Sequence, residues 1–311
     1  MRTRTSLAVL LGVALGAAAA IAYLPGRPGG YDALKFYLRA PAADTTAPAW
    51  VYFFTLPLSM LSWPLGWQAL AFLTVLSAGV AAFVWGNRRW WIVATSAPML
   101  WTIWLGQIEV FPVTGLIVGG LVLQRKVHPA WLGLASLLLM TKPQVGYGIL
   151  LLLLFWIWRD QGLGRPAIIQ GAIACVGLLI TTVLVWPDWL SNWLQTVSEF
   201  HPTWWDAAIW PYGLLAWPLV IFVVPKATKQ QALRMVSAAS LLGSPYFAMY
   251  HSVTCLTLTD NPLFTVLSWL IVLLGRGVPD DWMKLGWLLP VAVLISDVVS
   301  LSFARPTNHC S

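Results

Sequence analysis

Apolar runs alternate with short polar turns along almost the entire chain of 311 residues. Because an α-helix needs about 20 predominantly apolar residues to cross a bilayer, the longest runs are candidate membrane spans. They cover residues 6–24, 66–85, 167–186 and 285–303, and shorter runs cover 90–105, 110–123, 130–140, 145–158, 209–224, 232–250 and 263–274. The pattern predicts an all-α, polytopic transmembrane helical bundle that forms a single integral membrane domain over residues 1–311.

Composition supports this class. Hydrophobic residues make up 59% of the chain and charged residues only 9%, whereas a soluble domain carries about 25% charged residues. The net charge of +7 comes from basic residues scattered between apolar runs, so it indicates membrane topology and not a nucleic-acid partner. The three cysteines lack paired or metal-ligand spacing. We therefore expect no metal and no other cofactor.

The first polar interruption is the loop 25–50, which follows the apolar run 6–24. Arg2 and Arg4 precede that run, and the positive-inside rule then places the amino terminus in the cytoplasm and the loop outside the cell membrane. A cleaved signal peptide is the alternative for 6–24; its length and the spans that follow favour an uncleaved helix.

The apolar stretch 50–63 is short and contains Pro57. If both it and 66–85 crossed the bilayer, Arg88 and Arg89 would lie outside, against the positive-inside rule. We therefore predict that 50–63 is a re-entrant or interfacial helix. The remaining runs then give eleven crossings, with every basic turn in the cytoplasm and the carboxyl terminus outside.

Polar residues gather at the predicted outer ends of the spans. The outer loop 187–207 spaces its apolar residues at helical intervals, which predicts an amphipathic helix on the membrane surface. Strongly polar groups at membrane depth are costly unless they are satisfied, so those at the outer ends are candidates for a site. They are Asp32, Gln107, Glu109, Lys142, His201, Tyr246 and His251.

Each candidate also has a structural interpretation. Asp32 is a catalytic carboxylate, a solvated loop residue, or the cap of a short helix over residues 33–39. Gln107 either joins a site or satisfies backbone groups at its turn, and for Glu109 we expect solvation at that turn. Lys142 either extends to the lipid headgroups or binds a lipid phosphate, and we favour a site role for His251.

Four motifs occur in order over roughly residues 6–275: YDALKFY, WLGQIEV, LLLMTKPQ and GSPYFAMYH. With these motifs the chain resembles the GT-C superfamily of membrane glycosyltransferases, and specifically glycosyltransferase family 87, which uses polyprenol-phosphate-mannose as its donor. The family commonly has an asparagine where this chain has Glu109.

The resemblance implies a GT-C-like bundle that transfers a sugar, here expected to be mannose, with inversion. The donor would be a polyprenyl-phosphate sugar and the acceptor a hydroxyl of a lipid or glycan on the extracytoplasmic face. Asp32 would be the general base and Lys142 would bind the donor phosphate. The resemblance further implies a donor-binding role for His251, Gln107, Arg39, Lys35 and Tyr246.

Two other classes of function remain open. A lipid or small-molecule transporter or flippase also places polar groups in a helical bundle, although it would show paired halves with broken helices near the midplane. A non-catalytic membrane subunit of an assembly is the other alternative. The identities of the sugar and the acceptor depend on pocket shape, which residues from several helices would build together.

Overall fold

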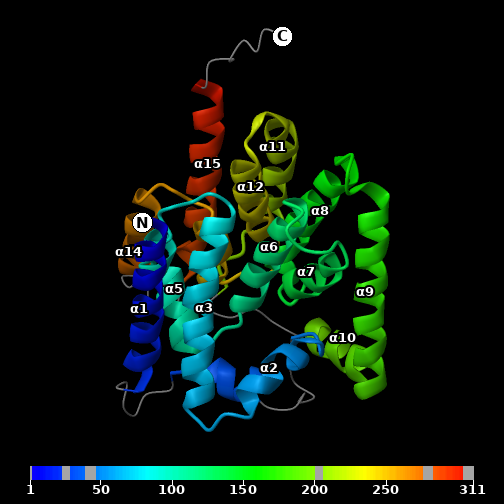
Figure 1. Ribbon diagram of the computed structural model, residues 1–311. Helices are drawn as coiled ribbons and strands as arrows, with labels where there is room; N and C mark the ends of the chain where they lie inside the picture. Colours follow the sequence, from blue (N-terminus) through cyan, green and yellow to red (C-terminus); the bar gives the residue numbers. More distant parts are fainter. Residues whose placement is uncertain (1, 23–28, 39–46, 200–205, 276–282, 304–311) are drawn as a thin grey trace.

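The computed structural model describes residues 2–22, 29–38, 47–199, 206–275 and 283–303. In these ranges the chain is all-helical, with no strand, as predicted (Figure 1). The helices are α1 Arg2–Ala22, η1 Ala33–Tyr37, α2 Val51–Ser59, α3 Leu65–Val84, α4 Trp91–Ala94, α5 Ala97–Leu105, α6 Val110–Leu123, α7 Trp131–Leu139, α8 Pro143–Arg159, α9 Gly164–Val185, α10 Trp189–Glu199, η2 Tyr212–Leu215, α11 Ala216–Val223, η3 Val224–Lys226, α12 Lys229–Leu242, η4 Met249–Ser252, α13 Val253–Thr257, α14 Leu263–Gly275, η5 Lys284–Trp287 and α15 Leu288–Phe303.

Three helical segments of the described chain are long and apolar enough to cross a membrane: α3, α9, and η5 with α15. Helices α5 and α6 together make a fourth candidate, although the chain bends by 118° between them. These helices support a multi-pass membrane protein. Helix α7 has nine residues. At about 1.5 Å per residue its length is much less than the thickness of the hydrocarbon core, about 30 Å.

Two predicted runs differ from the observed helices. The run 90–105 is divided into α4 and α5, because the Ser96 side chain accepts the Met99 N–H and begins a new helix. The run 232–250 was predicted as one helix, but α12 ends at Leu242 and the chain turns through Ser244 and Pro245. Proline lacks the N–H that a continuing helix would need, and it disfavours helical geometry in the residue before it.

The two predicted non-spanning helices are present as helices. Helix α2 is a nine-residue helix within 50–63, and α10 lies within 187–207. Figure 1 shows both at the lower end of the bundle, whereas α11 lies at the upper end.

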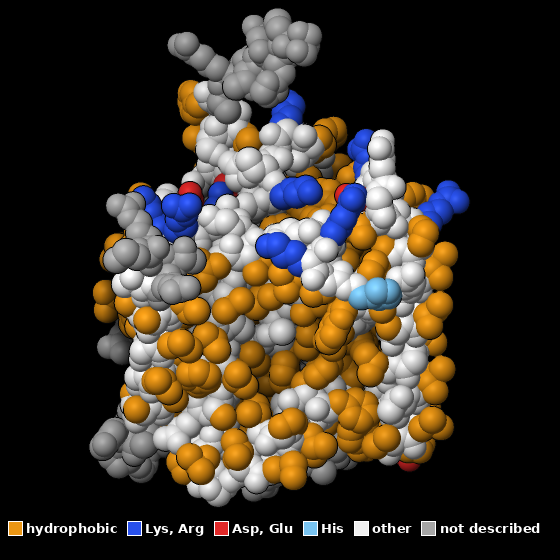
Figure 2. Space-filling model, viewed as in Figure 1, with side chains coloured by type: hydrophobic (Ala, Val, Ile, Leu, Met, Phe, Trp, Pro, Cys, Tyr) orange, Lys and Arg blue, Asp and Glu red, His pale blue; other side chains and the backbone are white. Residues whose placement is uncertain are grey.

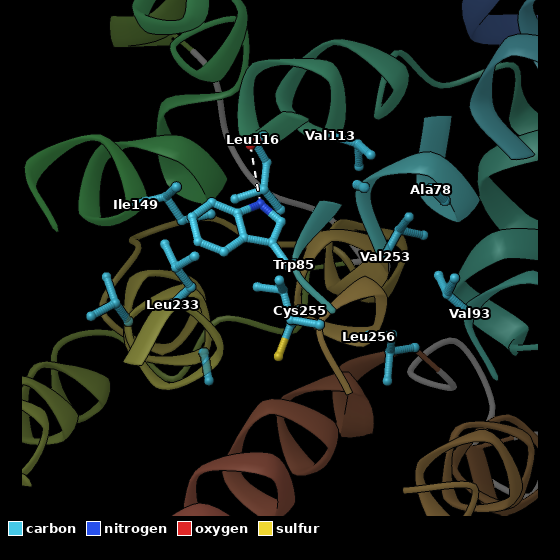
Figure 3. Packing of buried hydrophobic residues seen from close by; sticks show 14 of the residues in the cluster. Ala78, Trp85, Val93, Val113, Leu116, Ile149, Leu233, Val253, Cys255 and Leu256 are labelled. Atoms are coloured by element: carbon cyan, nitrogen blue, oxygen red, sulfur yellow. Dashed lines mark hydrogen bonds between the residues drawn. The ribbon is translucent and has the colours of Figure 1, made fainter. Parts of the chain in front are cut away.

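The hydrophobic core joins helices from both halves of the chain. The Trp85 indole N–H donates to the Leu116 carbonyl across 3.1 Å, while Leu233 and Cys255 are buried in the same cluster. Figure 3 shows these side chains pointing toward one another from α6, α12, α13 and the end of α3. Because lipid tails are as apolar as this core, close van der Waals packing of such side chains is what stabilises the bundle. The core therefore holds the polar turns at either end in fixed positions.

Basic residues gather at one end of the bundle. Figure 2 shows Lys and Arg side chains toward the upper end and apolar side chains over the middle and lower surface. Hydrogen bonds and an ion pair join the turns at this end: Gln124 donates to the Val84 carbonyl, and Arg125 lies 2.6 Å from Asp160. The exposed basic residues of these turns are Arg88, Arg89, Arg125, Lys126, Arg159, Arg165, Lys226 and Lys229.

Candidate functional site

The site begins at the sharp turn between α5 and α6. Gly106 ends α5 with a left-handed backbone, φ 72°, which glycine adopts without strain. A Cβ at this position would lie 2.6 Å from the Cβ of Ala33. Glycine is therefore required both for the turn and for the close approach of η1 to it.

The segment that carries Asp32 is fixed against the end of α5. The Gly30 N–H donates to the Trp104 carbonyl across 2.7 Å, and the Trp67 indole N–H donates to the Ile103 carbonyl across 2.8 Å. Asp32 precedes η1, but its side chain caps no helix. The capping alternative for Asp32 is thus wrong, and its carboxylate is available to the α5–α6 turn.

Gln107 connects the Asp32 segment with the α7–α8 turn. Its side-chain N–H donates to an Asp32 carboxylate oxygen, and its carbonyl oxygen accepts a 2.7 Å hydrogen bond from Lys142 Nζ. The Tyr37 hydroxyl also donates to this oxygen across 3.3 Å. The amide thus turns its donor toward the anion and its acceptor toward the cation, which is the orientation that the two charges favour.

Lys142 and Glu109 form a buried ion pair. The distance from Lys142 Nζ to Glu109 Oε2 is 2.6 Å, and the two residues are 5% and 0% exposed. The expectation that Glu109 is solvated is therefore wrong. The α5–α6 turn packs against the start of α8 and against η4, and these two segments exclude water from the carboxylate.

His251 lies on the other side of Glu109. Its Nδ1 accepts the Ala248 backbone N–H across 3.0 Å, so the neutral ring carries its proton on Nε2. Nε2 lies 3.7 Å from Glu109 Oε1 and 3.4 Å from the side-chain amide of Gln144. This geometry assigns His251 as a neutral ring whose Nε2 proton lies on the side of Glu109, while the Gln144 amide nitrogen, itself a donor, cannot accept that proton.

Tyrosine rings complete the surroundings of the ion pair. Lys142 Nζ lies 4.9 Å from the centre of the Tyr250 ring, a distance typical of a cation–π contact. The hydroxyls of Tyr246 and Tyr250 are 3.4 Å apart, and the Tyr246 ring meets His251 edge to face. Tyr246 thus lies beside His251, with which the sequence analysis grouped it as a candidate donor-binding residue.

A cavity of about 580 Å³ opens over these groups. Its volume suits a small organic ligand such as one sugar with a phosphate group. The lining includes Gln107, Lys142, Tyr246 and His251 from the polar cluster and Trp193 from α10. Asp32 is not among the described lining residues, and it meets the cavity through its hydrogen bond with Gln107.

The environment of Asp32 changes its acidity. Burial raises the pKa of Asp32 from its ordinary 3.8 to about 6, and Lys142, Gln107 and Lys35 offset only part of this effect. Asp32 is therefore mostly ionised at pH 7, with a pKa close to the pH at which a general base works best.

Lys35 is exposed, and its Nζ lies 5.0 Å from the centre of the Phe36 ring. The positive charge of Lys35 lowers the pKa of Asp32 and so offsets part of the effect of burial on this carboxyl group. Arg39 and His201 lie outside the described residues. Within the described chain, no group of three His, Cys, Asp or Glu side chains could hold a metal ion.

The sequence placed Glu109 among the candidates but favoured solvation for it, although its position two residues after Gln107 was a usable signal for the site. Lys142 and His251 come from segments far along the chain, and their contact with Glu109 depends on tertiary packing. Comparison of the chain with protein-family models, curated proteins and solved structures finds no match. The function is therefore argued from the site and from the four sequence motifs.

Proposed function

We propose that the protein is an inverting, membrane-embedded glycosyltransferase that moves a sugar, mannose by the motif resemblance, from a polyprenyl-phosphate carrier to a hydroxyl of a lipid or glycan. The observation that carries this proposal is the chain of contacts from Asp32 through Gln107 to Lys142 beside a cavity of about 580 Å³. It links a carboxylate with a raised pKa, which lies behind Gln107, to a lysine ammonium that lines the cavity.

The carboxylate would act on the acceptor. Asp32 accepts the proton of the attacking hydroxyl, whose oxygen forms the new bond to the anomeric carbon as the bond to the donor phosphate breaks. A positioned base of this kind contributes about 10²- to 10⁴-fold to the rate. Since Asp32 lies behind Gln107, the acceptor hydroxyl must approach from the side of η1.

The cationic side of the cavity would act on the donor. Lys142 Nζ stabilises the negative charge that develops on the phosphate as the carrier leaves. Gln107, His251 and Tyr246 line the same cavity and supply hydrogen bonds to the phosphate or the sugar. Lys35 and Arg39 are proposed to attract the anionic headgroup toward the loop that they occupy.

The arrangement of charges supports an extracytoplasmic site. The basic turns lie at one end of the bundle, and the turns that build the site belong to the opposite ends of α6 and α8. By the positive-inside rule the basic end is cytoplasmic, as is the amino terminus. The prediction of eleven crossings with an outer carboxyl terminus is not supported, because α15 ends at the same basic end as the start of α1 (Figure 1), where the Gln231 side-chain N–H donates to Ser300 Oγ across 3.4 Å.

The test is transfer from a synthetic polyprenyl-phosphate mannose by the purified protein in lipid nanodiscs. We expect product with the wild type and at least about 100-fold less with Asp32→Asn. Asp188→Asn is the matched control: it makes the same substitution at an exposed carboxylate that directly precedes α10. Transfer by Asp32→Asn at the wild-type rate would refute the role of Asp32, and absence of wild-type transfer to any lipid or glycan acceptor would refute the function.

Transport is the second candidate, and the bent pair α5–α6 favours it. Broken helices with polar groups at the break are typical of transporter sites, and Gln107 and Glu109 occupy this break. A transporter would move a labelled polyprenyl-phosphate sugar between the leaflets of vesicles without altering it. In the described chain only this one pair forms a candidate span with a bend at a short break, whereas transporters show such breaks in both halves.

A further inference from the structure

The charge of Lys142 is already neutralised in the structure. Its Nζ lies 2.7 Å from Gln107 Oε1 and 2.6 Å from Glu109 Oε2, and the ring of Tyr250 covers a further side. An ammonium in this state has little net attraction for a second anion. Phosphate binding at Lys142 therefore requires a change in its pairing with Glu109.

The cluster as a whole has an excess of negative charge. Asp32 and Glu109 are two carboxylates, and Lys142 is the buried ammonium that contacts Glu109 directly and Asp32 through Gln107. The other groups that face Glu109 or surround it are His251 and the hydroxyls of Tyr37, Tyr246 and Tyr250. Lys35 is exposed to solvent, and its charge acts on Asp32.

A donor phosphodiester would add another negative charge to this cluster. Burial of an uncompensated charge costs several kcal/mol, and buried groups therefore change their protonation state to avoid it. One proton on the cluster would restore its original charge when the donor binds. The geometry then decides which group receives that proton.

His251 is a poor acceptor for it. An imidazolium carries a proton on both nitrogens, but Nδ1 already accepts the Ala248 N–H across 3.0 Å. Glu109 is a better acceptor, because neither of its oxygens takes a well-aligned hydrogen bond from the described chain. Lys142 at 2.6 Å and His251 at 3.7 Å are its nearest charged or titratable partners.

We propose that Glu109 is the exchangeable counter-ion of Lys142, so that one proton is taken up from solvent when the lipid phosphate binds. Lys142 transfers its contact from the Glu109 carboxylate to a phosphate oxygen, and Glu109 becomes a neutral carboxylic acid. The proton returns to solvent when the product phosphate leaves. This inference rests on the proposed function, since it needs a phosphate ligand, and it makes Glu109 a positioning residue for Lys142.

Isothermal titration calorimetry tests the proposal. The probe is a short-chain prenyl-phosphate mannose, a phosphodiester with one fixed negative charge, titrated into the protein in nanodiscs at pH 8. Two buffers with different protonation enthalpies give the number of protons taken up. We expect about one proton per ligand, and an affinity that falls about tenfold for each pH unit over which Glu109 is ionised in the free protein.

Variants identify the group that takes the proton. Glu109→Gln should bind the probe with no proton uptake and with little pH dependence, whereas Asp32→Asn and His251→Gln should retain uptake. Glu199→Gln, at an exposed carboxylate on α10, is the control for the same substitution elsewhere. Binding to the wild type without proton uptake, or undiminished uptake in Glu109→Gln, would overturn the inference and leave the proposed function intact. If the wild type does not bind the probe, both are refuted.

Discussion

The buried pair of Lys142 and Glu109 gives the sharpest prediction for stability. Lys142→Met removes the ammonium but keeps a long apolar side chain, and Glu109→Gln removes the carboxylate charge at constant shape. Each single change leaves the opposite charge buried without its partner. The double variant Lys142→Met with Glu109→Gln leaves no unpaired charge at these positions.

The expected magnitude follows from the distance and the burial. For an N–O distance of 2.6 Å, Coulomb attraction at an effective dielectric constant of about 20 is about 6 kcal/mol. Removal of one partner from a buried pair typically costs about 3–5 kcal/mol, because the remaining charge is desolvated without compensation. The double variant should lose much less than the two single losses combined.

The assay is reversible unfolding of the purified protein in mixed micelles, followed by tryptophan fluorescence at pH 7.5. A coupling free energy above about 2 kcal/mol between the two substitutions would support a tight, dry ion pair. Losses that simply add in the double variant, within about 0.5 kcal/mol, would show that the two groups do not interact and would refute the described geometry of the site.

Three further predictions concern Asp32 and Gly106. The pH profile of kcat/KM for wild-type transfer should fall on the acid side with an apparent pKa near 6, the value to which burial raises the pKa of Asp32, and an acid limb near 4 would contradict the buried environment. The same shift predicts that the free energy of unfolding of the wild type falls by at most about 3 kcal/mol as the pH rises from about 4 to 6, because burial penalises the ionised carboxylate. In unfolding experiments, Asp32→Asn should remove this dependence on pH. Gly106→Ala should lower the free energy of unfolding by about 1–3 kcal/mol, since the backbone φ at this position is 72° and the added Cβ would meet Ala33. Gly177→Ala is the control: a Cβ there meets no atom within 4 Å, so this variant should be as stable as the wild type.

Most helices were predictable from the sequence because their signals are local. The run 110–123 became α6 with the same bounds, and 263–274 became α14 to within one residue. Apolar runs between polar turns have few alternatives in a membrane, since every backbone group must be paired within its own helix. The early end of α12 was missed, although Pro245 was a sequence signal for it.

The environment of the candidate site was less predictable. Gln107, Lys142 and His251 could be grouped by their positions near the ends of predicted spans, but Glu109 was expected to face solvent. Its burial depends on segments that are distant in sequence, the start of α8 and η4. A hydropathy pattern contains no information on which turns pack against one another at the same end of a bundle.

The central position of Gln107 has a consequence for how the site acts. One amide holds Asp32 by its N–H group and Lys142 by its oxygen, so the groups proposed for the acceptor and for the donor are parts of a single network. Substitutions at Asp32 and Lys142 should then be non-additive in transfer kinetics, because each removes a partner that orients the amide for the other. If a donor phosphate draws Lys142 away from Gln107, only the longer hydrogen bond from the Tyr37 hydroxyl still orients the amide oxygen, and the hydrogen bond that holds Asp32 weakens at the moment when a base is needed. Donor binding would in this way prepare the carboxylate for the acceptor hydroxyl, and the two halves of the reaction would be coupled through one side chain.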